Sequence, residues 1–187
     1  MNISLQHKKA LICGSSQGIG FAIAKELALL GADCTLMARN EASLKMALTY
    51  LDTTHQQQHQ YLVADFSNTE NVRNAITTFA QKNAIEILVN NTGGPPSGQI
   101  ADATEEAFLQ AFNQHLICNH ILVKALLPAM KEKGYGRIIN VISTSVKMPL
   151  PNLGVSNTIR GAVASWSKTL ANEVGTFNIT VNNVLPG

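Results

Sequence analysis

The chain alternates between short apolar runs and longer segments in which apolar residues recur with helical spacing. The short runs suit buried strands, since a buried helix needs more residues. Predicted strands cover residues 10–13, 34–38, 61–64, 85–91, 136–143 and 177–185. Predicted helices cover residues 21–30, 41–51, 67–80, 104–130 and 156–174, the fourth capped by Asp102 or Thr104. This alternation predicts an α/β fold, a doubly wound parallel sheet in a three-layer α/β/α arrangement.

Local signals add detail to two segments. Ser67 and Glu70 have the spacing of a capping box, which predicts that the Ser67 side chain caps the third helix. Residues 53–60 show no periodicity and predict a polar surface connection. The histidines in this connection have no cysteine or acidic partner at metal-ligand spacing, so we predict no metal site there.

The first strand runs directly into a glycine-rich turn that contains Gly14, Ser16, Gln17, Gly18 and Ile19. Glycine lets the backbone turn sharply and approach a phosphate closely. The helix that follows presents free N–H groups at its start, which stabilise negative charge. The turn therefore predicts a dinucleotide site, although a glycine-rich turn between any buried strand and helix has the same pattern.

Length and composition favour a soluble single domain over residues 1–187, because ~150 residues is a common domain size. The net charge is +2 without a cluster of Lys and Arg, which excludes a nucleic-acid or anionic-membrane footprint. No apolar run reaches the ~18 residues of a membrane span, and residues 1–10 lack the apolar core of a signal peptide, so we expect a cytoplasmic protein. Cys13, Cys34 and Cys118 lie in apolar surroundings and are expected to be buried, reduced thiols.

The glycine turn resembles the T-G-x-x-x-G-I-G turn of the short-chain dehydrogenase/reductase family, with Cys13 in place of the usual threonine. Residues 90–93, Asn-Asn-Thr-Gly, resemble the family's N-N-A-G element, with Thr92 in place of alanine. The predicted fifth strand ends in Ser143, which matches the catalytic serine of the family. The resemblance implies a Rossmann-like fold and a nicotinamide dinucleotide cofactor.

The end of the second strand bears on the choice of cofactor. NAD-binding members have an acidic residue there to hold the ribose hydroxyls, whereas this chain has Arg39. An arginine can pair with a 2′-phosphate, which favours NADP(H); as a solvated loop residue it would leave NAD(H) open. By resemblance Asp65 contacts the adenine, with a helix cap as its alternative use. The expected cofactor contacts are Gly14, Ser16, Gln17, Gly18, Ile19, Arg39, Asp65, Phe66, Asn91, Gly93, Arg160, Pro186 and Gly187.

The catalytic tetrad of the family is Asn, Ser, Tyr and Lys, and only Ser143 is retained. Ungapped counting places Ser156 at the tyrosine, Arg160 at the lysine and His115 at the asparagine. A serine hydroxyl is a much weaker acid than tyrosine, whose pKa is ~10, so Ser156 cannot take over as proton donor. Arg160 keeps the positive charge and could bind the nicotinamide ribose. His115 is either a substitute acid, acting through water or Ser143, or a packed core histidine.

These departures resemble an atypical subgroup similar to β-ketoacyl-acyl carrier protein reductases. The resemblance implies an NADP(H)-dependent carbonyl reductase that acts on a small carbonyl or acyl-thioester substrate and forms a homodimer or homotetramer. The alternative is a catalytically inactive NAD(P)-binding sensor or oligomer partner. Members of the family continue after Pro186-Gly187 with a substrate lid, a helix and a seventh strand, so we expect the fold here to lack the C-terminal strand.

Overall fold

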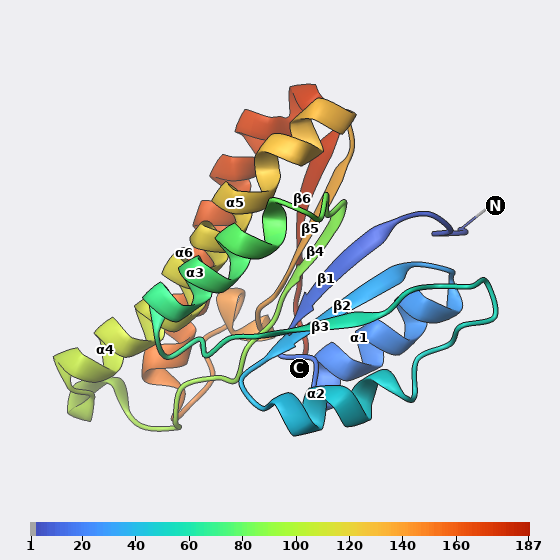
Figure 1. Ribbon diagram of the computed structural model, residues 1–187. Helices are drawn as coiled ribbons and strands as arrows, with labels where there is room; N and C mark the ends of the chain where they lie inside the picture. The colour runs from blue at the N-terminus through green and yellow to red at the C-terminus, as the bar shows by residue number, and fades with distance from the viewer. Residues whose placement is uncertain (1–2) are drawn as a thin grey trace.

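The computed structural model describes residues 3–187; Met1 and Asn2, at the start of the predicted polar N-terminus, lie outside the described residues. Its sheet is parallel, with the strand order β3-β2-β1-β4-β5-β6 (Figure 1). The strands are β1 Lys9–Cys13, β2 Asp33–Ala38, β3 Gln60–Val63, β4 Ile87–Asn90, β5 Gly136–Val141 and β6 Ile179–Val184. This topology confirms the predicted doubly wound α/β fold.

Helices cover both faces of the sheet (Figure 1). The α-helices are α1 Gly18–Leu29, α2 Glu41–Leu48, α3 Thr69–Ala80, α4 Glu105–Phe112, α5 Cys118–Lys133 and α6 Gly154–Val174. The alternation of side chains along β1 divides the core: Leu11 and Cys13 pack with α3, α5 and α6, whereas Ala10 and Ile12 pack with α1 and α2. Both faces of each central strand are thereby buried, which explains the continuous apolar runs of the sequence.

The predicted fourth helix contains a π-helical turn. Thr104 caps α4 by accepting a hydrogen bond from the Ala107 N–H at 3.2 Å. A π-helical segment, η2 (Asn113–Ile117), then joins α4 to α5. Helix α5 contains Pro128 and ends at Lys133, and the next residue, Gly134, has a left-handed φ of 60°. The predicted long helix is therefore present as one continuous helical stretch from Glu105 to Lys133, and the π-helical turn inside it is a feature that the apolar pattern did not reveal.

Three local predictions need correction. Asn68, not Ser67, caps α3; its side chain accepts from the N–H groups of Glu70 and Asn71. Gln57, within the supposed surface connection, is buried and donates to the Ala28 oxygen at 2.7 Å. Phe177 lies in a short 3-10 turn before β6. Asparagine caps helices as well as serine does, and Gln57 is buried because the Ala28 oxygen, distant in the sequence, accepts a hydrogen bond from its amide.

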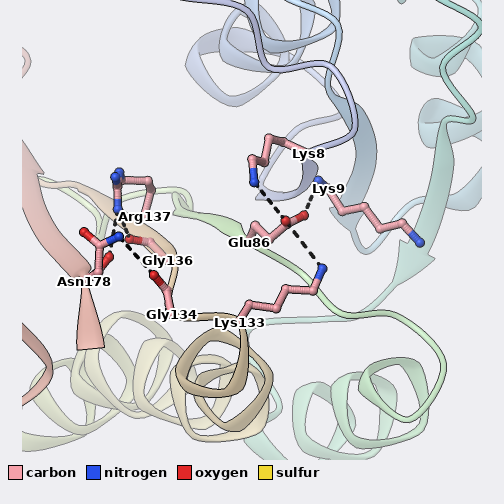
Figure 2. A network of polar contacts seen from close by, with 8 residues as sticks. All are labelled: Lys8, Lys9, Glu86, Lys133, Gly134, Gly136, Arg137 and Asn178. Carbon is pink, nitrogen blue, oxygen red and sulfur yellow. Dashed lines mark hydrogen bonds and ion pairs between the residues drawn. The ribbon is translucent and has the colours of Figure 1, made fainter. Parts of the chain in front are cut away.

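A buried carboxylate, Glu86, ties together the amino-terminal edge of the sheet (Figure 2). Its oxygens accept from the Lys8 ammonium at 3.2 Å and the Lys9 N–H at 3.0 Å, and the Lys133 ammonium lies 3.4 Å away. Nearby, the Arg137 guanidinium donates to the Gly136 oxygen at 2.8 Å. These contacts join the start of β1 to the end of α5, at the edge opposite the glycine turn.

Cys13, Cys34 and Cys118 are buried free thiols, and burial raises the pKa of the Cys118 thiol to about 11. Within residues 3–187, no group of His, Cys, Asp and Glu side chains is arranged to hold a metal ion. In the same part of the chain, no helix combines the length and apolar character that crossing a bilayer requires.

Candidate active site

The glycine turn lies where β1 and β4 leave the sheet, the point at which the strand order changes direction. Gly14 and Gly18 have φ values of 57° and 60°, which glycine adopts without strain. A Cβ on Gly20 would lie 2.4 Å from the Gly14 oxygen, and one on Gly14 would lie 2.7 Å from the Asn91 oxygen. The turn is therefore too tightly packed to accept side chains at Gly14 and Gly20.

Hydrogen bonds from two polar side chains, Asn91 and Ser15, fix the backbone of this turn. The Asn91 amide donates to the oxygens of Cys13 at 3.3 Å and Gly14 at 3.2 Å. The Ser15 hydroxyl donates to the Ile12 oxygen at 2.7 Å and accepts from the Met37 N–H at 3.0 Å. The carboxyl ends of β1, β2 and β4 are thus fixed relative to one another before any ligand binds.

Helix α1 starts from this turn with its first N–H groups uncapped by a side chain. Gln17, the residue before the helix, makes no capping hydrogen bond. Ile19, in the first turn, is 49% exposed, which is unusual for a large apolar residue. Free N–H groups beside an exposed apolar side chain suit the pyrophosphate and sugar of a dinucleotide.

A cavity of about 380 Å³ opens beside the turn. It brings together part of the predicted cofactor set, namely Gly14, Ser16, Gln17, Arg39, Asp65, Phe66 and Gly93. The sequence reasoning missed further lining residues, namely Ala38, Ala64, Thr92, Gly94 and Gln114. Most of these come directly after a predicted cofactor residue or after the last residue of a strand. Their position next to the strand ends is therefore a signal that could have identified them. Gln114 carried no such signal.

Arg39 and Asp65 give this cavity its charges. The N–H and hydroxyl of Ser67 are hydrogen-bond donors to the Asp65 carboxylate, and together with the Arg39 charge they lower the pKa of Asp65. The Arg39 side chain is exposed at the end of β2, with its charge available to an anion. The structure thus places a cation and an ionised carboxylate at the end where sequence reasoning expected the adenosine.

The remaining predicted cofactor residues lie outside this cavity. Gly18 and Ile19 begin α1, and Asn91 lies behind the turn. The Pro186 oxygen accepts from the Thr144 N–H at 3.1 Å, and Gly187 also lies beside Thr144. These last residues therefore adjoin the Ser143 end of the site.

Ser143 follows β5 and caps a short 3-10 turn, η3 (Thr144–Val146). Its hydroxyl oxygen accepts from the Ser145 N–H at 3.1 Å, which leaves the hydroxyl proton free to be donated. Arg160, on α6, donates from Nη1 to the Val141 oxygen at 2.9 Å. Ser156 lies one helical turn before Arg160 and is partly buried.

His115 lies in the π-helical segment and is 1% exposed. Its Nε2 has no hydrogen-bond partner among residues 3–187. Burial, with the positive charge of Arg160, lowers the pKa of His115 to about 3. The imidazole is therefore neutral near pH 7, which argues against its use as an imidazolium proton donor.

A larger cavity of about 590 Å³ lies between the loop that follows β4 and helix α4. Its wall includes Pro95, Pro96, Ala107, Ala111 and Val155, together with polar side chains such as those of Asp102 and Gln110. Gly94 and Gln114 line both this cavity and the smaller one, so the two adjoin. Sequence reasoning did not predict it.

Backbone hydrogen bonds fix the wall of the larger cavity. The Gly98 N–H donates to the Asn152 oxygen at 2.7 Å, and the Gly154 N–H donates to the Gly98 oxygen at 3.1 Å. A Cβ on Gly154 would lie 2.6 Å from Ile100, so only glycine allows this approach. The loops after β4 and β5 consequently form one wall.

The model of the short chain dehydrogenase family matches residues 8–187. The chain belongs to this family. The chain is 32% identical to the oxidoreductase YvrD of Bacillus subtilis, covering 100% of this chain and 70% of YvrD. It is 33% identical to a ketoacyl reductase assigned to the granaticin polyketide synthase of Streptomyces violaceoruber, covering 95% of this chain and 66% of that protein.

The short-chain dehydrogenase fold is also seen in solved structures. The L-sorbose reductase of Gluconobacter frateurii, complexed with NADPH and L-sorbose, superposes with a TM-score of 0.93 at 32% identity. This match covers 100% of the present chain and 72% of the sorbose reductase. The arrangement of strands, turn and helices described above is therefore that of the short-chain dehydrogenases.

Proposed function

We propose that this short-chain dehydrogenase is an NADP(H)-dependent carbonyl reductase similar to the 3-oxoacyl reductases. The observation that carries the proposal is the junction of the two cavities at Gly94 and Gln114. One cavity adjoins the glycine turn and Arg39, and the other is large enough for a small substrate. A cofactor in the first would lie next to a carbonyl compound in the second.

The residues present fit NADP(H). The tight turn at Gly14 and Gly20 allows a pyrophosphate to approach the uncapped start of α1. Arg39 is exposed and would pair with the 2′-phosphate, while Asp65 would accept hydrogen bonds from the adenosine part. The NADPH bound by the L-sorbose reductase supports the same cofactor here. When bound, NADPH supplies the hydride.

Ser143 and Arg160 would act on the carbonyl group. The Ser143 hydroxyl, whose oxygen already accepts from the Ser145 N–H, would donate its proton in a hydrogen bond to the carbonyl oxygen. The positive charge of Arg160 would stabilise the negative charge that develops on that oxygen. Water would supply the proton, because solvent is in large excess and replaces the hydroxide formed, whereas a deprotonated Ser156 would remain in the site and His115 is neutral.

A second candidate is an NADP(H)-binding protein without turnover, acting as a sensor or oligomer partner. It is favoured by the lack of a suitable acid among these four residues: Ser143 and Ser156 are weak acids, Arg160 retains its proton, and His115 is a neutral imidazole near pH 7, whose remaining N–H is a very weak acid. In either case we expect a homodimer or homotetramer. Exposed apolar residues on α4, Leu109 at 63% and Phe112 at 38%, are suited to an interface.

One experiment separates the candidates. The protein is titrated with NADPH and NADH by fluorescence, and oxidation of the bound cofactor is then followed with a panel of 3-oxoacyl thioesters and simple ketones. Binding with turnover supports the reductase. Binding without turnover on any substrate favours the sensor, and failure to bind either nucleotide refutes both.

A further inference from the structure

Arg160 is a partly buried cation without a carboxylate partner. Among the ion pairs formed by residues 3–187, Glu86 pairs with Lys8 and Lys133, but none includes Arg160. Among residues 3–187, the hydrogen bond that Arg160 makes goes to a neutral group, the Val141 oxygen. Burial lowers the pKa of the guanidinium, and no neighbouring acid opposes this effect.

An unpaired charge in such a place is unfavourable, because it loses hydration without gaining an opposite charge. The Nη1 atom is used by Val141, whereas Nη2 lies on the side of Gly94, 3.8 Å from the position of a Cβ on that residue. Gly94 is where the two cavities meet. The free part of the guanidinium therefore lies beside the junction that a substrate would occupy.

A second buried polar group beside Arg160 also lacks a partner. Within the described part of the chain, His115 Nε2 makes no hydrogen bond, and the residue is only 1% exposed. His115 is close enough to Arg160 for the charge to lower its pKa. Native proteins rarely leave buried polar atoms unsatisfied, so this grouping indicates that a ligand completes it.

We propose that Arg160 binds a carboxylate of the substrate, so that this protein reduces oxo acids in preference to neutral ketones. The inference rests on the reductase function proposed above. Ribose hydroxyls are neutral and would leave the cation unpaired, whereas a carboxylate matches both the charge and the planar donors of arginine. A neutral His115 can present an N–H at Nε2 to the same anion.

The reaction balances without a further reactant. Hydride from NADPH adds to the carbonyl carbon of a 3-oxo acid, and the electron pair of the C=O π bond moves to oxygen. Water supplies the proton to that oxygen, which gives a 3-hydroxy acid, NADP⁺ and hydroxide. The carboxylate stays bonded to its chain and serves only for recognition.

Matched substrates test the proposal. The substrates are 3-oxobutanoate and its methyl ester, which differ in that only the first carries a carboxylate. We would measure kcat/KM for each substrate with the wild type and with three variants, Arg160→Gln, Arg160→Lys and Lys168→Gln. The loss of a charge-assisted contact in Arg160→Gln should lower kcat/KM for the acid roughly 10- to 100-fold. Acid and ester alike would lose the stabilisation of the developing oxyanion by Arg160, so the carboxylate contact is measured by the ratio of kcat/KM for the acid to kcat/KM for the ester, which should fall roughly 10-fold or more. Arg160→Lys should restore part of the preference for the acid.

Lys168→Gln is the control, because it also removes one positive charge, but from an exposed position on the same helix. It should keep the wild-type ratio of kcat/KM for the acid to kcat/KM for the ester. NADPH affinity is measured in parallel by fluorescence. The proposal is overturned if the ratio of kcat/KM for the acid to kcat/KM for the ester is the same in the wild type and in Arg160→Gln. A weaker NADPH affinity in Arg160→Gln with an unchanged ratio also overturns it, since Arg160 would then serve the cofactor.

Binding distinguishes this inference from the proposed function. If no carbonyl compound oxidises NADPH, the reductase function fails, and binding of 3-oxobutanoate to the NADP⁺-loaded protein is measured by calorimetry. Saturable binding to the wild type that is lost in Arg160→Gln supports the carboxylate site even without turnover. Failure of the wild type to bind 3-oxobutanoate overturns it.

Discussion

The Arg160 guanidinium donates a hydrogen bond to the main-chain oxygen of Val141 at 2.9 Å. This contact joins helix α6 to the end of β5, just before the Ser143 turn. The Arg160 side chain, which carries the positive charge, is thus held against β5, the strand that leads into Ser143 and its hydroxyl. The cation and the hydroxyl keep their relative position, which hydride transfer to a carbonyl requires.

Ser143→Ala should lower kcat about 100-fold or more, because the hydrogen bond to the developing oxyanion is lost. The affinity for NADPH should stay nearly unchanged, since the nucleotide cavity lies elsewhere. Steady-state kinetics and fluorescence titration check both expectations. Thr144→Ala removes the neighbouring, exposed hydroxyl and is the control. Equal turnover of Ser143→Ala and wild type would remove Ser143 from the mechanism.

Arg39→Asp should move the cofactor preference from NADPH towards NADH. Loss of the pair with the 2′-phosphate should weaken NADPH binding roughly 10- to 100-fold, and the new carboxylate can accept from the ribose hydroxyls of NADH. Dissociation constants for both nucleotides are compared with those of Lys25→Asp, an equal charge change at an exposed position on α1. An unaltered preference would refute the assignment of Arg39.

Gly20→Ala should abolish nucleotide binding and destabilise the fold, because its Cβ would lie 2.4 Å from the Gly14 oxygen. Gly161→Ala is the matched control: nothing lies within 4 Å of its Cβ position in α6. An alanine there should stabilise the protein by about 0.5–1 kcal/mol through helix propensity. Urea unfolding and NADPH titration compare the two. Normal binding by Gly20→Ala would contradict the role of this close packing.

Glu86→Gln should lower the free energy of unfolding by about 1–3 kcal/mol at pH 7, since charge-assisted hydrogen bonds at the amino-terminal edge are lost (Figure 2). Burial alone would raise the pKa of Glu86, but the Lys9 N–H, the Lys8 ammonium and the Lys133 charge together lower it. Urea unfolding measures the difference. Glu132→Gln, an exposed neighbour of Lys133, should change stability by less than about 0.5 kcal/mol.

The pH dependence of this effect follows from the lowered pKa. The stabilisation by Glu86 is fully present above the pKa of an unfolded glutamate, ~4.3, and is lost as the pH falls through the lower pKa of the folded protein. The stability difference between wild type and Glu86→Gln should therefore shrink below about pH 4. A difference that stays constant down to pH 2 would show that Glu86 acts through packing alone.

Ala107→Leu should narrow the larger cavity, in whose wall Ala107 lies. Under the proposed function, kcat/KM should fall more steeply for carbonyl substrates with long chains than for short ones, because the added side chain occupies the space of the tail. Ala42→Leu, at an exposed site on α2, is the control. Equal effects on all chain lengths would place the substrate outside this cavity.

The sequence alone determined the order and type of most elements, the glycine turn and the candidate cofactor residues. These features depend on local information: apolar periodicity marks buried strands and helices, and the steric freedom of glycine marks the tight turn. Arg39, Asp65 and Asn91 follow strand ends, and parallel strands bring their carboxyl ends to one edge. Their approximate gathering could therefore be predicted.

Only the tertiary structure decided how distant segments meet. It placed a π-helical turn around His115 within the long helix, and it brought Val155 of α6 to the wall of the larger cavity, whose other lining residues lie between Gly94 and Gln114. It also left Arg160 without a carboxylate partner beside Gly94. Burial, ion pairing and cavity shape depend on contacts across the fold, and no local pattern of residues encodes those contacts.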